Sequence, residues 1–297
     1  MREPGTKIII RLSGGLGNQL FQYATGRYIA TKNNAELMVD DTMLNVHRYG
    51  VTKRAYELDF YHIRARKLST EEKIILQLRV RRPFRYLYDV RIIKSSFIYY
   101  RESHFEFDPK LHQLTGNLII EGYWQSERYF NKIAEDIRRD LQPVTPPQVT
   151  IQGLLDQVMG TNSVSIHVRR GDFIHNPRAA SSHVVCDLLY YQRAVAFIAE
   201  RVTNPVFFVF TDDPDWVSKY FDINFPMVLV SRPRSIPAYE DLRLMSHCAN
   251  NIMANSSFSW WGSWLNPNPE KIVVAPVRWF QEEKNMQDLI PHTWNVL

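Results

Sequence analysis

The sequence predicts an α/β protein built from two doubly wound domains. In the C-terminal half, continuous apolar runs of strand length alternate with stretches whose apolar residues recur at helical spacing. The N-terminal half opens with the same strand–helix–strand order. The stretch "LQPVTPPQVT" (141–150) lies between the halves, and its prolines exclude regular helix and suit an extended linker. We therefore expect domains over residues 1–148 and 149–297.

Three elements open the N-terminal domain. The pattern predicts a strand over 7–13, a helix over 18–33 and a second strand over 35–41. The first apolar run is short and ends in glycines, so it does not read as a secretory signal. No window approaches the roughly 18 uninterrupted apolar residues of a membrane span, and the expected location is the cytoplasm. The middle of this domain, rich in aromatic and basic residues, shows no clear periodicity.

The C-terminal domain has a regular rhythm of strands and helices. Strands are predicted over 163–172, 205–213, 226–231, 251–255 and 271–277, and helices over 187–202, 214–221, 238–250 and 257–266. Apolar strands that alternate with helices indicate a parallel sheet covered on both faces. Ligands of such sheets bind beyond the carboxyl ends of the strands, so the motifs at those ends are the candidates for a site.

The charge of the chain is positive and unevenly distributed. The net charge is +5, and residues 64–101 carry eleven Lys or Arg against three Asp or Glu. A solvated face, an anionic membrane surface and an anionic substrate are all open readings of this stretch. No nucleic-acid-binding motif accompanies the charge, so nucleic acid is not an expected partner. Cys186 and Cys248 are too far apart in sequence for a zinc motif and are expected to be buried thiols.

A glycine cluster follows the first strand. In "GGLGNQ", Gly15 and Gly17 permit positive φ and close backbone approach, and the free amides of a helix start attract anions. A dinucleotide fingerprint requires a third glycine where Leu20 stands, and a P-loop requires Gly-Lys-Ser/Thr, which Asn18-Gln19 does not supply. The alternative is a tight strand-to-helix turn that binds nothing.

A basic pair ends the first strand of the C-terminal domain. In "HVRRGDF" (167–173), His167 and Arg169 lie on one face of the strand and Arg170 points elsewhere. Arginine suits the bidentate recognition of a diphosphate. The alternative is an internal ion pair with Asp172, because a buried charge requires a partner.

Acidic residues end the next strand. Asp213 in "FTDDPD" (210–215) is a good N-cap for the following helix. Asp213 and Asp215 also form a D-x-D motif, but hard cations require several convergent oxygens and no second acidic cluster is evident. A carboxylate at this strand end could instead accept hydrogen bonds from guanine.

A tryptophan-rich helix follows the fourth strand. In "NSSFSWWGSWLN" (255–266), Asn255, Ser256 and Ser257 are N-cap types, and the helix start offers a second anion cradle. The three tryptophans are of the kind that most often packs in a core. Two cradles with a basic strand end nearby suggest a nucleoside diphosphate.

Four segments, taken in order, resemble glycosyltransferase family 11, the inverting α-1,2-fucosyltransferases, which include bacterial and animal galactoside 2-fucosyltransferases. They are "GGLGNQLFQYA" near the start, "GYWQSERYF" (122–130), "HVRRGDF" and "NSSFSWWGSWL". A weaker fifth segment, "HVVCDLLYYQRA" (183–194), has Val184 where the family usually has glycine. The likeness covers nearly the whole chain, and the combination is specific although each segment alone is weak.

The resemblance implies a GT-B fold, in which two Rossmann-like domains face a cleft, with a GDP-fucose donor and no metal or other cofactor. Related fucosyltransferases bind the diphosphate with the first arginine of a His-x-Arg pattern, which is Arg169 here. Asp212 or Asp213 would read guanine, and Asp213 is preferred. The implied donor contacts are Gly15, Gly17, Asn18, His167, Arg169, Arg170, Asp213, Asn255, Ser256, Ser257 and Phe258.

The implied reaction is attack of a galactose 2-hydroxyl on fucose C1, from the face opposite GDP. Arg169 and the helix starts would stabilise the leaving diphosphate, and one such preorganised donor is worth about 3 kcal/mol. Asn18 would approach the sugar and diphosphate from the N-terminal domain. His183 is the expected general base, Asp172 is its alternative, and a dissociative path would need little base at all.

The expected acceptor, a β-galactoside glycan, would contact the N-terminal domain. Tyr123 and Trp124 offer aromatic faces to a sugar ring, and Gln125 offers an amide to hydroxyls; core packing is the alternative for Trp124. The basic stretch 64–101 would hold the enzyme at the anionic inner membrane, where lipid-linked glycans are built.

Three rival functions stay open at this point. A transferase with another donor, such as GDP-mannose, has the same chemistry. A nicotinamide-dependent oxidoreductase would need the missing third glycine and an acid after the second strand, where Asp40 and Asp41 do stand. A non-enzymatic sugar-binding module would not need Arg169.

Overall fold

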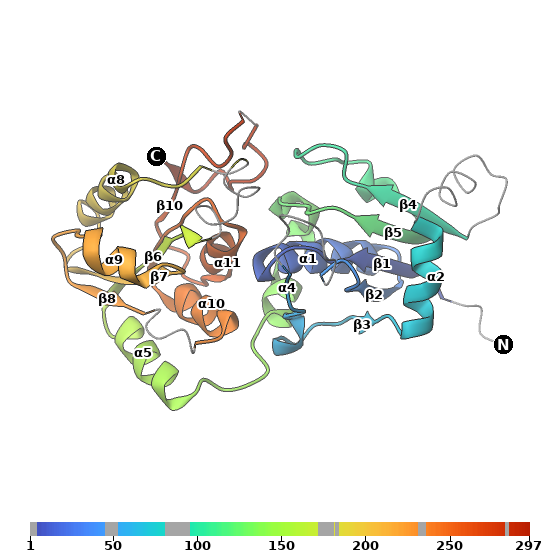
Figure 1. Cartoon of the computed structure of the whole chain (residues 1–297), viewed down its shortest axis with the longest axis horizontal. Helices are drawn as coiled ribbons and strands as arrows, with labels where there is room; N and C mark the ends of the chain where they lie inside the picture. The colour runs from blue at the N-terminus through green and yellow to red at the C-terminus, as the bar shows by residue number, and fades with distance from the viewer. Residues whose placement is uncertain are drawn as a thin grey trace. The chain divides into compact units, whose positions relative to one another are not determined.

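The structure is a computed structural model that describes residues 5–44, 53–80, 96–171, 181, 184–230, 236–282 and 285–297. The chain forms two compact units, Met1–Gln142 and Pro143–Leu297, labelled by element in Figure 1. The division lies within the proline-containing stretch 141–150. Each unit has its own sheet and is described by itself.

Unit 1 contains a five-stranded parallel sheet in the order β3-β2-β1-β5-β4. Its strands are β1 (Lys7–Arg11), β2 (Glu36–Asp40), β3 (Arg66–Lys67), β4 (Phe97–Arg101) and β5 (Asn117–Glu121). Its α-helices are α1 (Leu16–Lys32), α2 (Thr70–Val80) and α4 (Ala134–Asp140), and its 3₁₀ helices are η1 (Leu58–Phe60), η2 (Leu111–Gln113), η3 (Glu127–Tyr129) and η4 (Asn131–Ile133).

Helices cover both faces of this sheet. Ile10 and Leu37 approach Gly26 of α1, whereas the neighbouring residues Ile9 and Met38 pack with Leu76 of α2. Successive residues of a strand point to opposite faces, so the two helices lie on opposite sides of the sheet. Strand order reverses between β1 and β5, which makes the carboxyl ends of these two strands a topological switch point.

Unit 2 contains a six-stranded parallel sheet in the order β11-β10-β9-β6-β7-β8, the strand order of a Rossmann fold counted from β6. Its strands are β6 (Asn162–Val168), β7 (Pro205–Thr211), β8 (Met227–Leu229), β9 (Asn250–Ile252), β10 (Val273–Ala275) and β11 (Asn295–Val296). Its helices are α5 (Val149–Met159), α8 (Leu188–Ala199), α9 (Pro214–Tyr220), α10 (Ala238–His247) and α11 (Ser257–Leu265).

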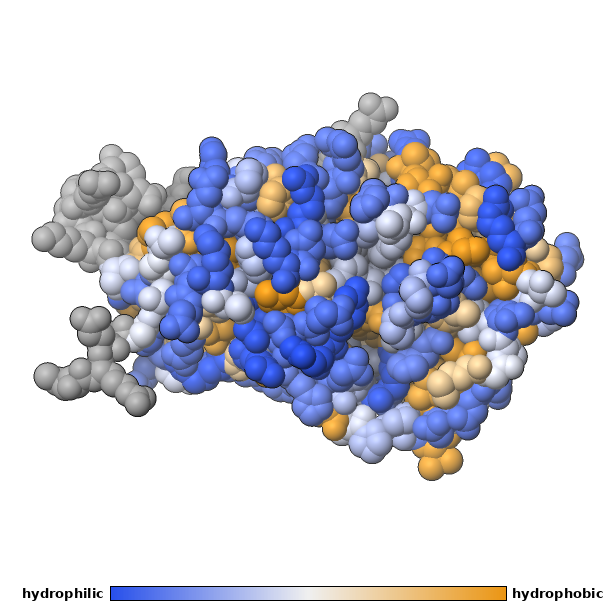
Figure 2. Space-filling model, turned by 180° about the vertical axis from the view of Figure 1, so that it is seen from behind, coloured by the Kyte–Doolittle hydropathy of each residue, from blue (hydrophilic) through white to orange (hydrophobic). Residues whose placement is uncertain are grey.

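Two apolar clusters bury the faces of this sheet. Val164 and Ile166 of β6 pack with Tyr191 of α8, and Phe208 of β7 packs with Leu244 of α10. Burial on both faces explains why these strands read as continuous apolar runs. Figure 2 shows the outer surface on one face, where polar side chains are spread over unit 1 and apolar ones gather in several groups on unit 2.

Several predictions about the core are confirmed. Cys186 and Cys248 are free, buried thiols, and burial raises the pKa of Cys186 to about 11. Trp260 and Trp261 are fully buried in unit 2, so the tryptophan-rich helix is a core element.

Within the described residues, no helix is long and apolar enough to cross a membrane.

Candidate functional site

The candidate site of unit 2 lies at the carboxyl ends of β6, β7 and β9. Strand order reverses between the neighbouring strands β6 and β9, so their ends form the switch point at which open α/β sheets bind ligands. His167 is the penultimate residue of β6, and Arg169 and Arg170 directly follow the strand. The start of α11 follows β9. The structure therefore brings the predicted basic residues and the predicted helix start to adjacent strand ends.

Arg169 forms an ion pair with the strand end beside it. Its Nη1 lies 2.9 Å from Oδ2 of Asp212, at the end of β7. The other Asp212 oxygen, Oδ1, accepts a hydrogen bond from the Arg170 amide at 2.9 Å. Asp212 is thus the partner that the structure describes, while Asp172 lies outside the described residues. The Arg169 side chain is 25% exposed, so its guanidinium is held in place and still reachable by a ligand.

Arg170 points away from Arg169, as the strand register predicts. Its guanidinium carbon lies 3.8 Å from the centre of the Trp216 ring, a cation–π contact. Its Nε is 3.5 Å from Oδ2 of Asp213. Arg170 therefore packs onto α9 in this structure.

Asp213 is the N-cap of α9, which confirms that part of its prediction. Its Oδ1 accepts a hydrogen bond from the Trp216 amide at 3.1 Å, and Pro214 takes the first helical position. Its carboxylate is therefore already engaged by a helix start and by Arg170. The prediction that Asp213 reads guanine stays a prediction, and Asp212, 24% exposed and bonded to Arg169, is an equally placed alternative.

His167 is buried and electrically neutral. Its side chain is only 5% exposed, and its ring centre lies 5.7 Å from that of Phe258. Burial lowers the pKa of His167, and the positive charge of Arg169 lowers it further. Nδ1 has no hydrogen-bond partner among the described residues. A buried ring nitrogen of this kind calls for a ligand or water to satisfy it.

The start of α11 is capped by Ser256. Its Oγ accepts a hydrogen bond from the Phe258 amide at 3.3 Å, which confirms the predicted cap. Ser256, Ser257 and Phe258 are half-buried, so this helix start reaches the surface. A helix start beside an unsatisfied buried histidine and an arginine can bind an anion.

Asn255 corrects one prediction. The side chain is 1% exposed, and its Nδ2 donates to the carbonyls of Val184 at 2.6 Å and Trp279 at 2.9 Å. Its Oδ1 accepts from the thiol of Cys186 at 3.5 Å. The prediction that the Asn255 side chain contacts the donor is wrong, because its polar atoms are buried and used to tie neighbouring segments together.

The positive φ in the glycine loop of unit 1 lies at Gly14, whereas Gly15 has φ −76° and is the N-cap of α1. Gly14 has φ +80°, and a Cβ there would overlap the Asn18 side chain. A Cβ on Gly15 would meet no atom within 4 Å, so this side of the loop is open. Gly17 is buried in the first turn of α1.

The carboxylate of Glu57 accepts a hydrogen bond at the start of α1. The amide of Leu16 donates to the carboxylate of Glu57, whose pKa is raised by burial in spite of Arg54 and this bond. Gln19 holds the same segment, since its Oε1 accepts from the Glu57 amide at 3.0 Å. The prediction that this helix start is a free anion cradle is therefore wrong at Leu16, and the donor roles of Gly15 and Gly17 stay predictions.

Two predicted residues of unit 1 meet at its switch point. Nε2 of Gln125, after β5, donates to Oδ1 of Asn18 at 2.7 Å. Gln22 strengthens the same junction, because its Nε2 donates to the Gly122 carbonyl at 2.9 Å and its Oε1 accepts from the Ser13 amide at 3.0 Å. The loops after β1 and β5 are thus fixed together.

Tyr123 and Trp124 have opposite environments. Tyr123 is 45% exposed and keeps its predicted availability for a sugar. Trp124 is fully buried, with its ring stacked on Tyr100 and edge-on to Tyr129. The prediction that the Trp124 ring stacks on an acceptor is wrong, and the core-packing alternative is correct.

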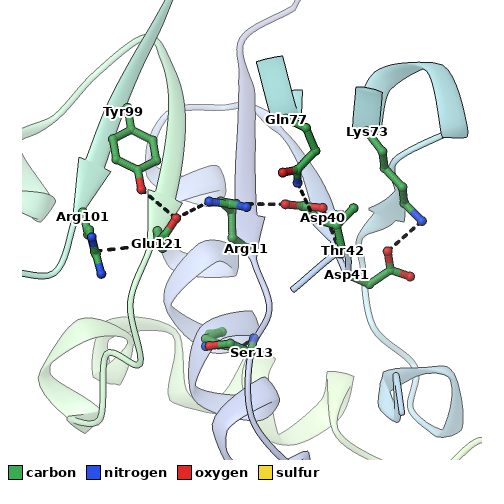
Figure 3. Close-up of polar contacts among 11 residues, drawn as sticks. Arg11, Ser13, Asp40, Asp41, Thr42, Lys73, Gln77, Tyr99, Arg101 and Glu121 are labelled. Atoms are coloured by element: carbon green, nitrogen blue, oxygen red, sulfur yellow. Dashed lines mark hydrogen bonds and ion pairs between the residues drawn. The ribbon is translucent and has the colours of Figure 1, made fainter. Parts of the chain in front are cut away.

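A row of charged residues that no motif predicted lies at the strand ends of unit 1 (Figure 3). Arg11 bonds to Asp40 on one side, at 2.9 Å from Nε, and to Glu121 on the other. Glu121 also accepts from the Tyr99 hydroxyl at 2.6 Å and lies 3.5 Å from Arg101. Asp40, Arg11, Glu121 and Arg101 are register partners across the sheet. A polar residue directly after an apolar strand core was the available signal.

This row weakens one rival function. Asp40 ends β2, where an oxidoreductase would hold a ribose, but it is fully buried and bonded to Arg11 and to the Thr42 amide. Asp41 pairs with Lys73 at 2.7 Å. Neither carboxylate is free for a nucleotide.

Two further predictions cannot be placed. His183 and Asp172, the alternatives for the general base, lie outside the described residues, as do Arg81 and Arg82 of the basic stretch. Among the residues that the structure does describe, no three His, Cys, Asp or Glu side chains gather as metal ligands would.

The two α/β units with parallel sheets have the GT-B fold, which is a class of glycosyltransferase folds. A solved structure of Arabidopsis thaliana FUT1, a mutant in complex with GDP, has this fold with a TM-score of 0.51 and 12% identity, covering 98% of this chain and 76% of that chain. POFUT1 in complex with GDP-fucose matches with a TM-score of 0.50 and 12% identity, covering 91% of this chain and 98% of that chain.

The chain belongs to glycosyl transferase family 11, which it matches over residues 7–297. It is 34% identical to the alpha-1,2-colitosyltransferase of Escherichia coli, over 97% of this chain and 97% of that protein. It is 31% identical to the O-antigen biosynthesis glycosyltransferase WbnK of Escherichia coli, over 95% of this chain and 98% of that protein. The family resemblance drawn from the motifs is confirmed.

Proposed function

We propose that this protein transfers L-fucose from GDP-β-L-fucose to the 2-hydroxyl of a terminal β-galactoside, with inversion to an α-1,2 linkage. The observation that carries the proposal is the end of β6. There, a buried neutral histidine whose Nδ1 has no hydrogen-bond partner among the described residues lies two residues from an arginine that is held by Asp212 and partly exposed. This pair beside a helix start suits a diphosphate. The acceptor belongs to an oligosaccharide or a lipid-linked O-antigen type of glycan.

The residues of unit 2 would hold the donor in distinct ways. Arg169 would exchange part of its pairing with Asp212 for the diphosphate. His167 would bond the same ligand through Nδ1, which is without a partner in the part of the chain that the structure describes. The amides at the start of α11 would add neutral donors. These groups supply positive potential where the leaving diphosphate gains charge, so the proposal includes no divalent metal and no other cofactor.

A second donor deserves equal testing, because one relative is named a colitosyltransferase. Colitose is fucose without one ring hydroxyl, so a site for either sugar would differ in a single polar contact. A site built to hydrogen-bond this hydroxyl strongly rejects a sugar that lacks it, whereas a site without that contact accepts both sugars. Donor preference therefore reports one interaction near the sugar.

Peripheral membrane contact is part of the proposal for a lipid-linked acceptor. In α2, Ile74, Ile75 and Leu78 are 58%, 52% and 51% exposed, with Arg79 in the last turn of the same helix. Exposed apolar side chains with cations suit an anionic bilayer surface. Sedimentation with anionic and neutral vesicles would test this, and equal binding to both would contradict it.

A donor panel tests the function. Purified protein is mixed with lactose and, separately, GDP-fucose, GDP-colitose or GDP-mannose, with and without EDTA, and the product linkage is read by NMR. We expect α-1,2 product from GDP-fucose that survives EDTA. Transfer that stops with EDTA would contradict the metal-free proposal. Product from GDP-colitose alone would replace the donor, and failure to bind any GDP-sugar would overturn the assignment.

A further inference from the structure

We propose that Glu102 is a positioning residue for acceptor binding, acting through the loop 122–126, named here the acceptor loop. The inference rests on the proposed function, since it assigns a role to Tyr123 and Gln125 in holding a sugar acceptor. No motif singled out Glu102, which directly follows β4.

Both carboxylate oxygens of Glu102 bond to consecutive amides of the acceptor loop. Oε2 accepts from the Tyr123 amide at 2.7 Å, and Oε1 accepts from the Trp124 amide at 2.9 Å. The approach is so close that a Cβ on Gly122 would overlap the Glu102 side chain. The loop therefore has glycine at position 122, where a larger side chain would overlap Glu102.

These bonds hold a backbone conformation that the chain would not otherwise favour. Trp124 has φ +57°, in the left-handed region that bulky residues rarely enter, at a typical cost of 1–3 kcal/mol. The buried ring and a bond from the Ser126 amide to the Trp124 carbonyl, 2.8 Å, also stabilise the turn. Strain of this kind persists only where several contacts enforce it, and it marks functional loops.

The turn separates the side chains of the loop. Trp124 enters the core, Tyr123 projects outward with 45% of its surface exposed, and Gln125 bonds to Asn18 at 2.7 Å. An outward aromatic ring and an amide at the switch point of unit 1 are the groups that a sugar needs. Both carboxylate oxygens of Glu102 accept hydrogen bonds from backbone amides, so its effect on the acceptor is indirect.

The test uses the full-length protein with Glu102→Gln, which keeps one acceptor oxygen and points an amide donor at the other N–H. The control is Glu135→Gln, whose carboxylate is 81% exposed in the same unit. We expect Glu102→Gln to raise the KM for lactose about tenfold, in line with one lost charge-assisted bond. The kcat and the Kd for GDP should stay within about twofold of the control.

A double-mutant cycle with Tyr123→Ala separates positioning from general stability. If Glu102 acts by presenting Tyr123, the two substitutions should raise the lactose KM less than additively. Amide hydrogen exchange in 122–126 should also quicken in Glu102→Gln, a readout that needs no acceptor. An unchanged lactose KM, a loss confined to kcat or to GDP binding, or unchanged exchange would overturn the inference.

The two proposals fail differently. A wild-type protein that transfers no sugar and binds no GDP overturns the function itself. Normal wild-type transfer with a lactose KM in Glu102→Gln equal to that of the control overturns only the role of Glu102.

Discussion

At the scale of single residues, the end of β6 presents a neutral imidazole, His167, and a guanidinium, Arg169, to the same site. Burial keeps His167 neutral. The carboxylate of Asp212 orients the Arg169 guanidinium through an ion pair. A neutral imidazole can donate or accept depending on its tautomer, while arginine always donates. A diphosphate attached to a nucleoside offers both charge and neutral acceptors, which suits this combination.

The buried carboxyl group of Asp241 in α10 predicts how the stability of the protein depends on pH. Its Oδ1 is buried without a partner among the described residues, and burial, with a smaller effect of Glu240, raises its pKa to about 7. Because the folded pKa exceeds the ordinary 3.8, the stability from the neutral form is present below about pH 4 and lost as pH rises through about 7. Asp241→Asn cannot ionise, so it should melt higher than wild type at pH 8.5 and near wild type at pH 4.

Thermal denaturation at the two pH values measures this effect. Each kcal/mol of unfolding free energy corresponds to a shift in Tm of about 2–4 °C for a domain of roughly 150–250 residues. The exposed Asp215→Asn is the matched control in the same unit. A pH-independent difference, or an equal gain in the control, would contradict the assignment.

At the scale of elements, the loop before α1 depends on one glycine and not on its neighbour. Gly14→Ala would place a Cβ at φ +80° and against Asn18, so we expect a loss of more than about 1 kcal/mol in unfolding free energy. Gly15→Ala meets no atom within 4 Å and should leave stability near wild type. Urea denaturation measures both variants.

The same pair of variants probes the donor role of the loop. If the sugar or diphosphate approaches Gly15, the alanine should weaken GDP-fucose binding while the fold stays intact. Equal stability of the two variants would contradict the backbone argument, and unchanged donor affinity in Gly15→Ala would contradict the donor contact.

The cap of α11 is a second element-scale prediction. Ser256→Ala removes the bond to the Phe258 amide and should cost about 1 kcal/mol of stability. It should also weaken GDP binding, because the cap fixes the helix start beside His167. Ser218→Ala on α9, an exposed serine that bonds within its own helix, is the control. GDP affinity equal to wild type would show that this helix start does not contact the donor.

Some elements were predictable and others were not, for physical reasons. Most strands of unit 2 are buried on both faces, so apolar residues dominate several of them, and each of β6–β10 was predicted. In unit 1, β3 has two residues and β4 carries the half-exposed Ile98, so neither gives a clear period. The sequence gives no local sign that 97–101 and 117–121 pair.

At the scale of the whole molecule, the motifs predicted which strand ends carry the candidate site but not how the residues there are used. Arg169 and Ser256 stand where their motifs predicted, whereas Asn255 and Trp124 are buried. Local sequence reports residue type and register, while burial depends on segments far away, such as Val184 and Trp279 around Asn255. Glu102 could not be predicted, because its role depends on a loop some twenty residues later.

The proposed function requires that the end of β6 bind the diphosphate of a GDP-sugar. Calorimetric titration of GDP into wild type, Arg169→Ala and Arg201→Ala tests it most directly. Arg201 is exposed and bonds to the end of its own helix, so it is the matched control. We expect micromolar binding to wild type and the control, and at least about tenfold weaker binding to Arg169→Ala. Binding to Arg169→Ala that equals the control would contradict the account.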